Sequence, residues 1–176
     1  FQSRFPDICI DFALYDWTTS KSMISNRLAD VGLITDAPKH ENWEKIHIES
    51  ARFVIYCRCD HPFAKRTKIS LSELEQETVI LPEKGSLTRH LLDQACDRYA
   101  ISLARTATMT TFPLMCEAVL QGIGVALFLQ NSSLIKDQLC EINIKEMPEV
   151  RNTSLIATKD RARLKLVLQF INAAIE

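Results

Sequence analysis

The sequence predicts an α/β fold in which a mostly parallel sheet carries helices on both faces. Apolar runs of strand length alternate along the chain with amphipathic helical segments, and the connections between them are short. No internal repeat, low-complexity tract or Gly/Ser linker interrupts this alternation. With 176 residues, 47% of them hydrophobic and 24% charged, the chain can form one substantial core or two small lobes that share crossing strands.

The first part of the chain predicts a strand, a helix and a second strand. Pro6 ends a segment that reads as the tail of a helix, and residues 8–14 then alternate apolar and polar side chains. A helix is expected over residues 16–30, behind a Thr-Thr-Ser start, and an apolar strand over residues 31–35. Because a natural chain seldom begins within a helix, we expect a fragment with at least one element missing upstream.

The rest of the chain continues the alternation. Residues 40–50 are polar and predict a loop with a short strand. Ser70 and Glu73 are spaced as in a capping box, which predicts the start of a short helix. Apolar runs predict further strands at residues 51–59, 78–82, 103–109, 123–128, 139–147 and 152–158. Helical spacing predicts helices at 85–100, at 110–122 with Pro113 in the first turn and Gly122 as the stop, and at 161–176 with Asp160 as the cap.

Charge and composition restrict the partners. The net charge of −1 and the pI near 6.5 argue against broad contact with nucleic acid or with an anionic membrane. The longest apolar run, residues 122–129, is far shorter than the ~20 residues that a transmembrane helix requires. Six cysteines lie in apolar runs, which predicts reduced, buried thiols in a cytoplasmic protein.

No motif predicts a metal, a cofactor or a catalytic residue. Cys57, Cys59 and His61 lie close together in the sequence, but they lack the paired knuckles of a structural zinc site. We interpret "RCDHPFAKRTKISLSEL", residues 58–74, as a joint between two parts of the fold. The chain contains no Gly-x-Ser-x-Gly elbow, none of its four histidines has a recognisable nucleophile beside it, and "GIGVAL" follows a helix instead of a strand.

Hydroxyl side chains recur where a predicted strand passes into a helix. They occupy Thr18 to Ser20, Ser86 with Thr88, and Thr110 with Thr111, while Thr35 ends a strand. The carboxyl ends of strands are where α/β sheets bind ligands, and free N–H groups at helix starts suit a small anion such as a carboxylate. Arg89 is placed to add a charge-assisted contact. The alternative is that these residues are only helix caps.

Several segments together resemble one known family. "FPDICIDFAL", "RLADVGLIT", "RFVIYCRCDHPFAKRTKISLSEL" and "VLQGIGVALF" have the order and spacing found in the effector-binding domain of LysR-type transcriptional regulators, over nearly the whole chain. The resemblance implies the type II periplasmic-binding-protein fold, with two Rossmann-like lobes joined by two crossover strands. Lobe I would comprise residues 1–57 with 152–176, and lobe II residues 58–151.

The resemblance also implies a function. A small, anionic effector would bind in the cleft between the lobes and shift the equilibrium between two arrangements of the oligomer, a homodimer or homotetramer, that controls DNA binding. The residues it places at the effector are Thr18, Thr19, Thr35, Ser86, Leu87, Thr88, Arg89, Thr110, Thr111 and Phe112. The family's first strand and its amino-terminal winged helix-turn-helix are absent, so DNA would be bound only through that missing domain. Ser86 stands near the position where peroxide-sensing members carry a cysteine, so thiol sensing there is not supported.

Two other functions share this scaffold. A periplasmic solute-binding protein of a transporter would be exported, and six reduced thiols argue against an oxidising compartment. An enzyme on the same scaffold would need a titratable group in the cleft, whereas the residues proposed to line it are hydroxyl-rich.

The charge and the missing domain lead to a first prediction. Mixed with promoter DNA in a gel-shift assay, this chain is expected to form no sequence-specific complex, because it lacks clustered Lys and Arg. A discrete, specific complex would contradict the division between effector binding and DNA binding.

Overall fold

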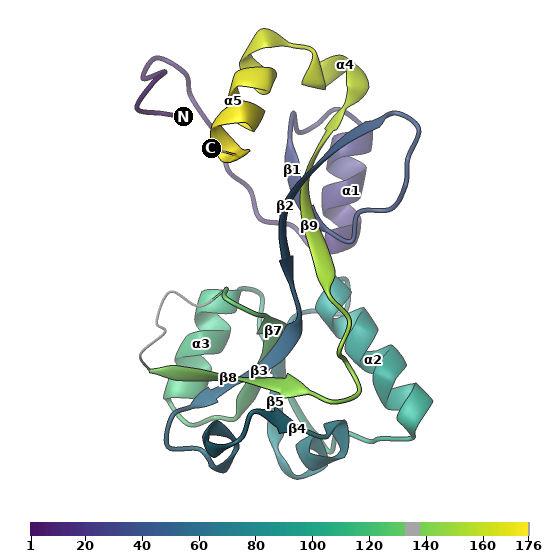
Figure 1. Ribbon diagram of the computed structural model, residues 1–176, viewed down its shortest axis with the longest axis vertical. Helices are drawn as coiled ribbons and strands as arrows, with labels where there is room; N and C mark the ends of the chain where they lie inside the picture. The colour runs from purple at the N-terminus through teal and green to yellow at the C-terminus, as the bar shows by residue number, and fades with distance from the viewer. Residues whose placement is uncertain (133–137, 176) are drawn as a thin grey trace. The chain divides into compact units, whose positions relative to one another are not determined.

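The chain divides into two compact units. The computed structural model describes residues 1–132 and 138–175. The first unit comprises residues 1–50 and 152–176, and the second comprises residues 51–151 (Figure 1). The chain passes from the first unit to the second after one strand and returns by another, which is the connection expected of two lobes joined by two crossover strands. The predicted boundary near residue 57 stays a prediction.

The first unit is built on a three-stranded sheet in the order β1-β9-β2, in which β1 and β9 are antiparallel. Its strands are β1 (Gly32–Thr35), β2 (Trp43–Ala51) and β9 (Arg151–Thr158), and its helices are α1 (Trp17–Ser25), α4 (Lys159–Ala162) and α5 (Lys165–Ile175). Consecutive residues of β9 face opposite sides of the sheet. Ile156 packs with Ile24 of α1, and Ala157 packs with Val167 and Ile171 of α5. The sheet therefore carries one helix on each face.

Several expectations for the first unit are wrong, including the helix tail predicted before Pro6, where the chain forms only turns. The alternating residues 8–14 form no strand, and Phe12 and Leu14 are exposed (84% and 75%). Alternation makes a strand only where a neighbour supplies hydrogen bonds, and none of β1, β9 and β2 pairs with residues 8–14. The strand predicted to be short within residues 40–50 is the long strand β2. Most of its side chains are not buried, so the sequence lacks the apolar run that would have predicted its length.

Asp160 does not cap a helix over residues 161–176. Thr158 occupies the capping position of α4, and Asp160 lies in its first turn. Arg27 holds the Asp160 carboxylate (Nε to Oδ2, 2.9 Å). The nearby side chain of Thr158, and then that of Arg27, lower the pKa of Asp160 to about 2. The chain turns at residues 163–164, so the predicted single helix is instead α4 followed by α5.

The second unit contains a six-stranded sheet in the order β4-β8-β3-β7-β5-β6. Its strands are β3 (Phe53–Arg58), β4 (Lys68–Ile69), β5 (Thr78–Leu81), β6 (Arg105–Thr108), β7 (Val125–Leu129) and β8 (Leu139–Ile144). The pairs β5·β6, β5·β7 and β4·β8 are parallel, whereas β3 is antiparallel to both of its neighbours. The expectation of a mostly parallel sheet is confirmed for this unit, with β3 as the exception, but not for the first unit, where β1 and β9 are antiparallel.

Helices cover both faces of this second sheet. They are α2 (Leu87–Tyr99) and α3 (Phe112–Leu120), together with the 3₁₀ helices η1 (Pro62–Lys65) and η2 (Leu71–Gln76). Ile55 and Cys57 of β3 face a core that includes Leu92 of α2. Val54 and Tyr56 face the opposite core, which includes Met115 of α3. The capping box of Ser70 and Glu73 is confirmed, although the helix that it begins is of the 3₁₀ type.

The cysteines are less buried than their apolar surroundings predicted. Cys57 and Cys116 are buried, and Cys96 and Cys140 are partly buried. Cys9 and Cys59 are exposed, which corrects the expectation for those two. None of these six cysteines forms a disulfide.

Gly124 shows how closely the backbone approaches itself at the start of β7. A Cβ at this position would lie 2.0 Å from the carbonyl oxygen of Thr78. Gly124→Ala is therefore expected to lower the free energy of unfolding by about 3 kcal/mol in urea denaturation, because the backbone of β5 must move.

Gly122→Ala serves as the matched control two residues away. There the new Cβ meets only the end of the Arg58 side chain, at 3.9 Å, and the cost is that of the positive φ of 76°. We expect a loss of about 1–2 kcal/mol. Equal losses for the two variants would contradict this account of Gly124.

Candidate functional site

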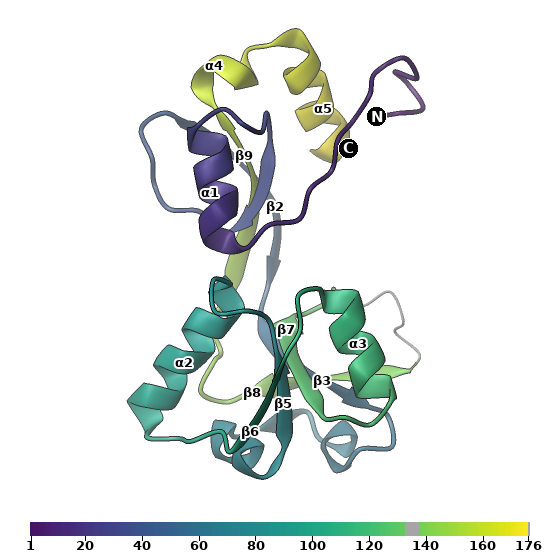
Figure 2. The same cartoon turned by 180° about the vertical axis from the view of Figure 1, so that it is seen from behind.

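Two helices of the second unit begin at the same edge of its sheet. β5 and β6 run parallel with Leu81 opposite Thr108, and the N–H of Met109 donates to the carbonyl of Leu81 (3.0 Å). α2 follows β5 and α3 follows β6, so both helices start beyond the carboxyl ends of neighbouring strands (Figure 2). The structure thus places residues 86–89 and 110–112, predicted from sequence, at one edge of the second unit. Thr18, Thr19 and Thr35 belong to the first unit.

The start of α2 combines a capped backbone with a partly buried cation. Ser86 Oγ accepts the N–H of Arg89 (3.1 Å), while the side chains of Leu87 and Thr88 are buried. The Arg89 side chain is only 18% exposed, and its Nε donates to the carboxylate of Asp93 (2.9 and 3.1 Å). Asp93, which the sequence reasoning missed, fixes the guanidinium through an i,i+4 pair. The other guanidinium nitrogens make no hydrogen bond to the described residues and can donate to an anion.

The start of α3 is polar on one side and aromatic on the other. Thr111 occupies the capping position, but its side chain makes no capping hydrogen bond. Phe112 stacks on Phe128 (4.3 Å between ring centroids) and meets Tyr56 edge-on (5.1 Å). A hydroxyl not used for capping therefore lies beside an aromatic cluster, a combination that suits a small molecule with polar and apolar parts.

Tyr56 anchors this aromatic cluster. Its side chain is fully buried, and its hydroxyl lies 2.6 Å from the carbonyl of Leu129 and 2.9 Å from Glu141 Oε1. It also accepts the N–H of Ser132 (3.1 Å). The sequence reasoning missed Tyr56 and Glu141; a tyrosine within the apolar run of residues 53–57 was the available signal, because a buried phenol needs a hydrogen-bond partner.

The start of α1, in the first unit, is already occupied by a carboxylate. Asp16 Oδ1 accepts the N–H groups of Thr18 (2.8 Å) and Thr19 (3.1 Å), and Oδ2 accepts the Thr19 hydroxyl. These hydrogen bonds, the one from the Thr19 side chain first, lower the pKa of Asp16. A second anion would meet this charge instead of free N–H groups. The sequence reasoning placed the helix start at Thr18 and Thr19, although aspartate is a common capping residue.

Thr35 is tied to α1 and to β9. Its hydroxyl lies 2.9 Å from that of Thr153, and its carbonyl accepts the indole N–H of Trp17 (2.9 Å). The amine of Lys21 lies over the Trp17 ring, 3.2 Å from its centroid, and partial burial lowers the pKa of this amine. Trp17, Lys21 and Thr153 were not predicted from sequence, because the contacts that involve them depend on how α1 and β9 pack against β1.

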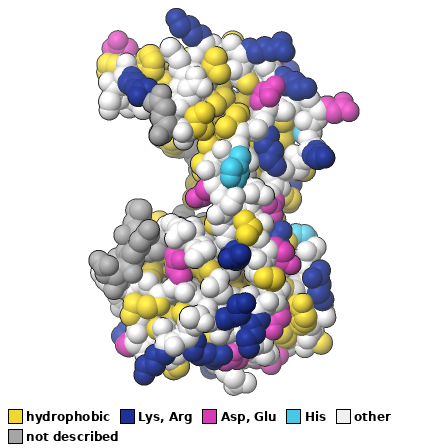
Figure 3. All heavy atoms as spheres, in the orientation of Figure 1, with side chains coloured by type: hydrophobic (Ala, Val, Ile, Leu, Met, Phe, Trp, Pro, Cys, Tyr) yellow, Lys and Arg dark blue, Asp and Glu magenta, His cyan; other side chains and the backbone are white. Residues whose placement is uncertain are grey.

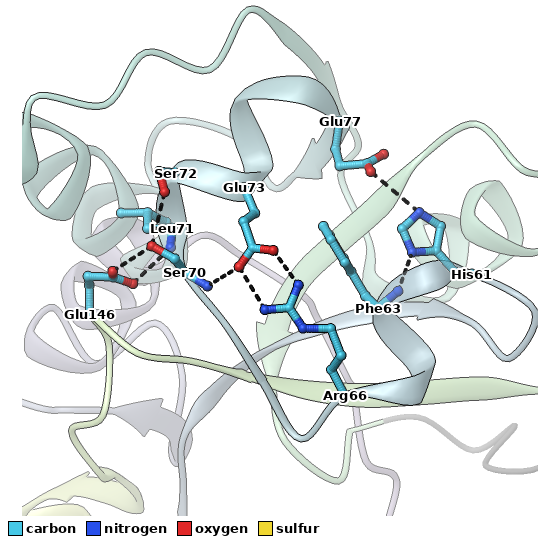
Figure 4. A network of polar contacts seen from close by, with 9 residues as sticks. All are labelled: His61, Phe63, Arg66, Ser70, Leu71, Ser72, Glu73, Glu77 and Glu146. Atoms are coloured by element: carbon cyan, nitrogen blue, oxygen red, sulfur yellow. Dashed lines mark hydrogen bonds and ion pairs between the residues drawn. The ribbon is translucent and has the colours of Figure 1, made fainter.

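Residues 58–74, interpreted as a joint, are held by capping interactions (Figure 4). His61 Nδ1 accepts the N–H of Phe63 (3.2 Å), and Nε2 lies 3.6 Å from Glu77. Glu73 pairs with Arg66 and accepts the N–H of Ser70 (2.7 Å). Among residues 1–132 and 138–175, no group of three or more His, Cys, Asp or Glu side chains is placed to hold a metal ion.

A shallow depression lies at the carboxyl end of α3, opposite to the end that carries Thr111. It is lined by Arg58, Cys59, Asp60, Glu117, Leu120, Gln121 and Gln138. Arg58 pairs with Asp60 (2.6 Å) and donates to the carbonyl of Leu120 (3.2 Å), so its charge is already neutralised.

The surface carries both signs of charge. On the face shown in Figure 3, Lys and Arg gather on the second unit with Asp and Glu among them, and no unbroken basic surface forms there. In the described part of the chain, no helix is long and apolar enough to cross a bilayer.

Comparisons with known proteins agree on one family. The model of the family described as the LysR substrate binding domain matches residues 1–176. The HTH-type transcriptional regulator CysL of Bacillus subtilis (strain 168) is 30% identical over 139 residues, which is 77% of this chain and 45% of CysL. The chain spans about half the length of the curated relatives it matches.

Solved structures share the fold. The regulatory domain of CcmR from Synechocystis PCC6803, in complex with 2-PG, has a TM-score of 0.79 at 18% identity, covering 99% of this chain and 85% of that one. The effector-binding domain of QuiR, in complex with shikimate, has a TM-score of 0.73 at 18% identity, covering 92% and 77%.

The cap of α1 gives a testable prediction. Asp16→Ala is expected to lower the free energy of unfolding by about 1 kcal/mol at pH 7, because Thr18 and Thr19 lose their acceptor. The pKa of Asp16 is lower in the folded state than its ordinary value of 3.8, so its contribution is present above that pH and is lost as the pH falls below it.

Asp11→Ala, at an exposed position outside any helix, is the control and should be neutral. Thermal unfolding of both variants between about pH 2 and pH 7 measures the difference. An Asp16→Ala variant as stable as the Asp11→Ala variant at pH 7 would show that Asp16 is not the cap.

Proposed function

The chain belongs to the LysR substrate-binding domain family, and we propose that it is the effector-sensing part of a LysR-type transcriptional regulator. The match over the whole chain supports this function over that of a transporter's solute-binding protein. In this proposal the chain is not an enzyme, and DNA is bound by residues outside it. The full protein is proposed to act in the cytoplasm as a homodimer or homotetramer. The six cysteines, none of which forms a disulfide, support this location.

The proposed effector is a small anion held at the starts of α2 and α3. The observation that carries this proposal is the partly buried Arg89, whose Nε is engaged by Asp93 while its other nitrogens remain able to donate. Thr111 adds a hydroxyl that makes no capping hydrogen bond, and Phe112 adds an aromatic face. Two related folds, those of CcmR and QuiR, were solved with small molecules, 2-PG and shikimate.

The first unit is proposed to have a different part in binding. Because Asp16 occupies the N–H groups of Thr18 and Thr19, this helix start favours hydrogen-bond donors of the effector over its anionic group. The predicted contacts of Thr18, Thr19 and Thr35, and the predicted cleft, stay predictions. An effector that prefers one state of the oligomer then shifts the equilibrium by no more than its differential affinity.

The experiment is a thermal-shift screen of the chain against small carboxylates. A true effector at about 100 times its dissociation constant stabilises the folded chain by roughly 2.7 kcal/mol. Arg89→Gln is expected to weaken binding at least tenfold, because it removes the cation while keeping the helix residue.

Arg98→Gln, in the last turn of the same helix, is the matched control and should bind as the wild type does. Thr18→Ala and Ser86→Ala test the hydroxyl turns of the two units separately. Unchanged affinity in Arg89→Gln would remove the start of α2 from the site. A carboxylate that is consumed during the titration would favour the enzyme alternative.

A further inference from the structure

Cys57 and Cys59, which are close in sequence, meet the distant Cys140 at one place in the second unit. β3 and β8 pair antiparallel, with Cys57 opposite Cys140 and Arg58 opposite Leu139. Cys59 follows two residues after Cys57, in the turn just beyond the end of β3. The thiol of Cys59 is in contact with that of Cys140, and Cys57 Sγ lies 3.8 Å from the Cys140 carbonyl.

The three thiols differ in their access to solvent. Cys57 is fully buried, Cys140 is partly buried, and Cys59 is exposed in the turn that follows β3. Cys59 also lines the open depression at the carboxyl end of α3. A reagent in solution therefore reaches Cys59 first, with Cys140 directly behind it.

We propose that Cys59 and Cys140 form a reversible disulfide, in which Cys59 reacts first and Cys140 closes the bond. The oxidant is a low-molecular-weight disulfide. This inference does not depend on the proposed effector, because Cys59 and the starts of α2 and α3 lie at different places in the unit.

The reaction has two exchange steps. The Cys59 thiolate attacks one sulfur of the reagent, a mixed disulfide forms, and one reagent thiolate leaves and takes up a proton. Cys140 then gives its proton to water and attacks the Cys59 sulfur, which releases the second reagent thiolate. Two protein thiols are oxidised, and one reagent disulfide is reduced to two thiols.

The surroundings of the thiols set the rates of these steps. Contact with Cys59 and then burial raise the pKa of Cys140 to about 11, and burial raises that of Cys57 to about 12. Both remain protonated near neutral pH, where a thiol is a poor nucleophile. Closure by Cys140 is therefore slow at neutral pH and accelerates about tenfold for each unit of pH.

The bond would connect two distant parts of the chain. It joins the end of β3 to β8 and encloses the segment that contains β4 to β7, α2 and α3. Such a cross-link restricts the unfolded chain, so the oxidised form should melt at a higher temperature than the reduced form.

The test uses oxidised glutathione and mass spectrometry on the full chain carrying Cys9→Ser, which removes the other exposed thiol. At about pH 7.5 the expected product is a glutathione adduct at Cys59. At about pH 9.5 the adduct should be lost, leaving a protein lighter than the reduced form by two hydrogen atoms. Proteolytic mapping under non-reducing conditions should then link the Cys59 peptide to the Cys140 peptide.

Variants separate the two steps. Cys140→Ser should stop at the adduct, Cys59→Ser should form neither product, and Cys96→Ser, a control in α2, should behave as the parent does. An adduct at Cys59 that never resolves at the higher pH, or a link from Cys140 to Cys57, would overturn the proposal. Proteolytic mapping of the disulfide in the parent protein tests the proposal even where a variant fails to fold.

Discussion

The second unit depends on one constraint, which is that β3 must run against the direction of every strand around it. Its residues 54–57 are completely buried, with alternate side chains in the two cores on either face of the sheet. Because β3 lies between β7 and β8, its hydrogen bonds join the β7-β5-β6 half of the sheet to the β8-β4 half. The same strand positions Tyr56 beneath Phe112 and places Cys57 and Cys59 beside Cys140. The features proposed to bind an effector and to form a disulfide thus both rest on the register of β3.

The helix starts resemble one another in sequence but differ in chemistry. At α1 a carboxylate holds the backbone N–H groups, at α2 a serine does so beside a restrained guanidinium, and at α3 the threonine makes no capping bond. The capping group determines whether a helix start can bind the anionic group of a ligand, because a charged cap repels a second anion. Hydroxyl residues at the turns are therefore insufficient to predict an anion site; the group that already satisfies the N–H donors must be known.

The sequence predicted structure correctly where it depends on the local pattern of residues. It was misleading where structure depends on contacts with residues far away in the sequence. Residues 78–81, 87–99 and 125–129 formed the expected strands and helix, because apolar periodicity and caps act within a few residues. Residues 8–14 alternate as a strand does, but no strand of the sheet pairs with them. Asp160 is a residue type that often caps helices, but its carboxylate is bound by Arg27. The Cys59–Cys140 contact and the Trp17–Thr35 hydrogen bond could not be predicted from the sequence, because they depend on strand register and on helix packing.

The hydroxyl of Tyr56 carries a single hydrogen, yet it faces two oxygen acceptors, Leu129 O and Glu141 Oε1. If that hydrogen is given to Leu129, the carboxylate must find another donor, and the backbone N–H of Asn131 supplies one at 2.9 Å. Asn131 can do so because its backbone is left-handed (φ 60°), a conformation that asparagine tolerates better than most residues. The number of hydrogen-bond donors around the buried Tyr56 hydroxyl thus restricts which amino acid can stand at position 131.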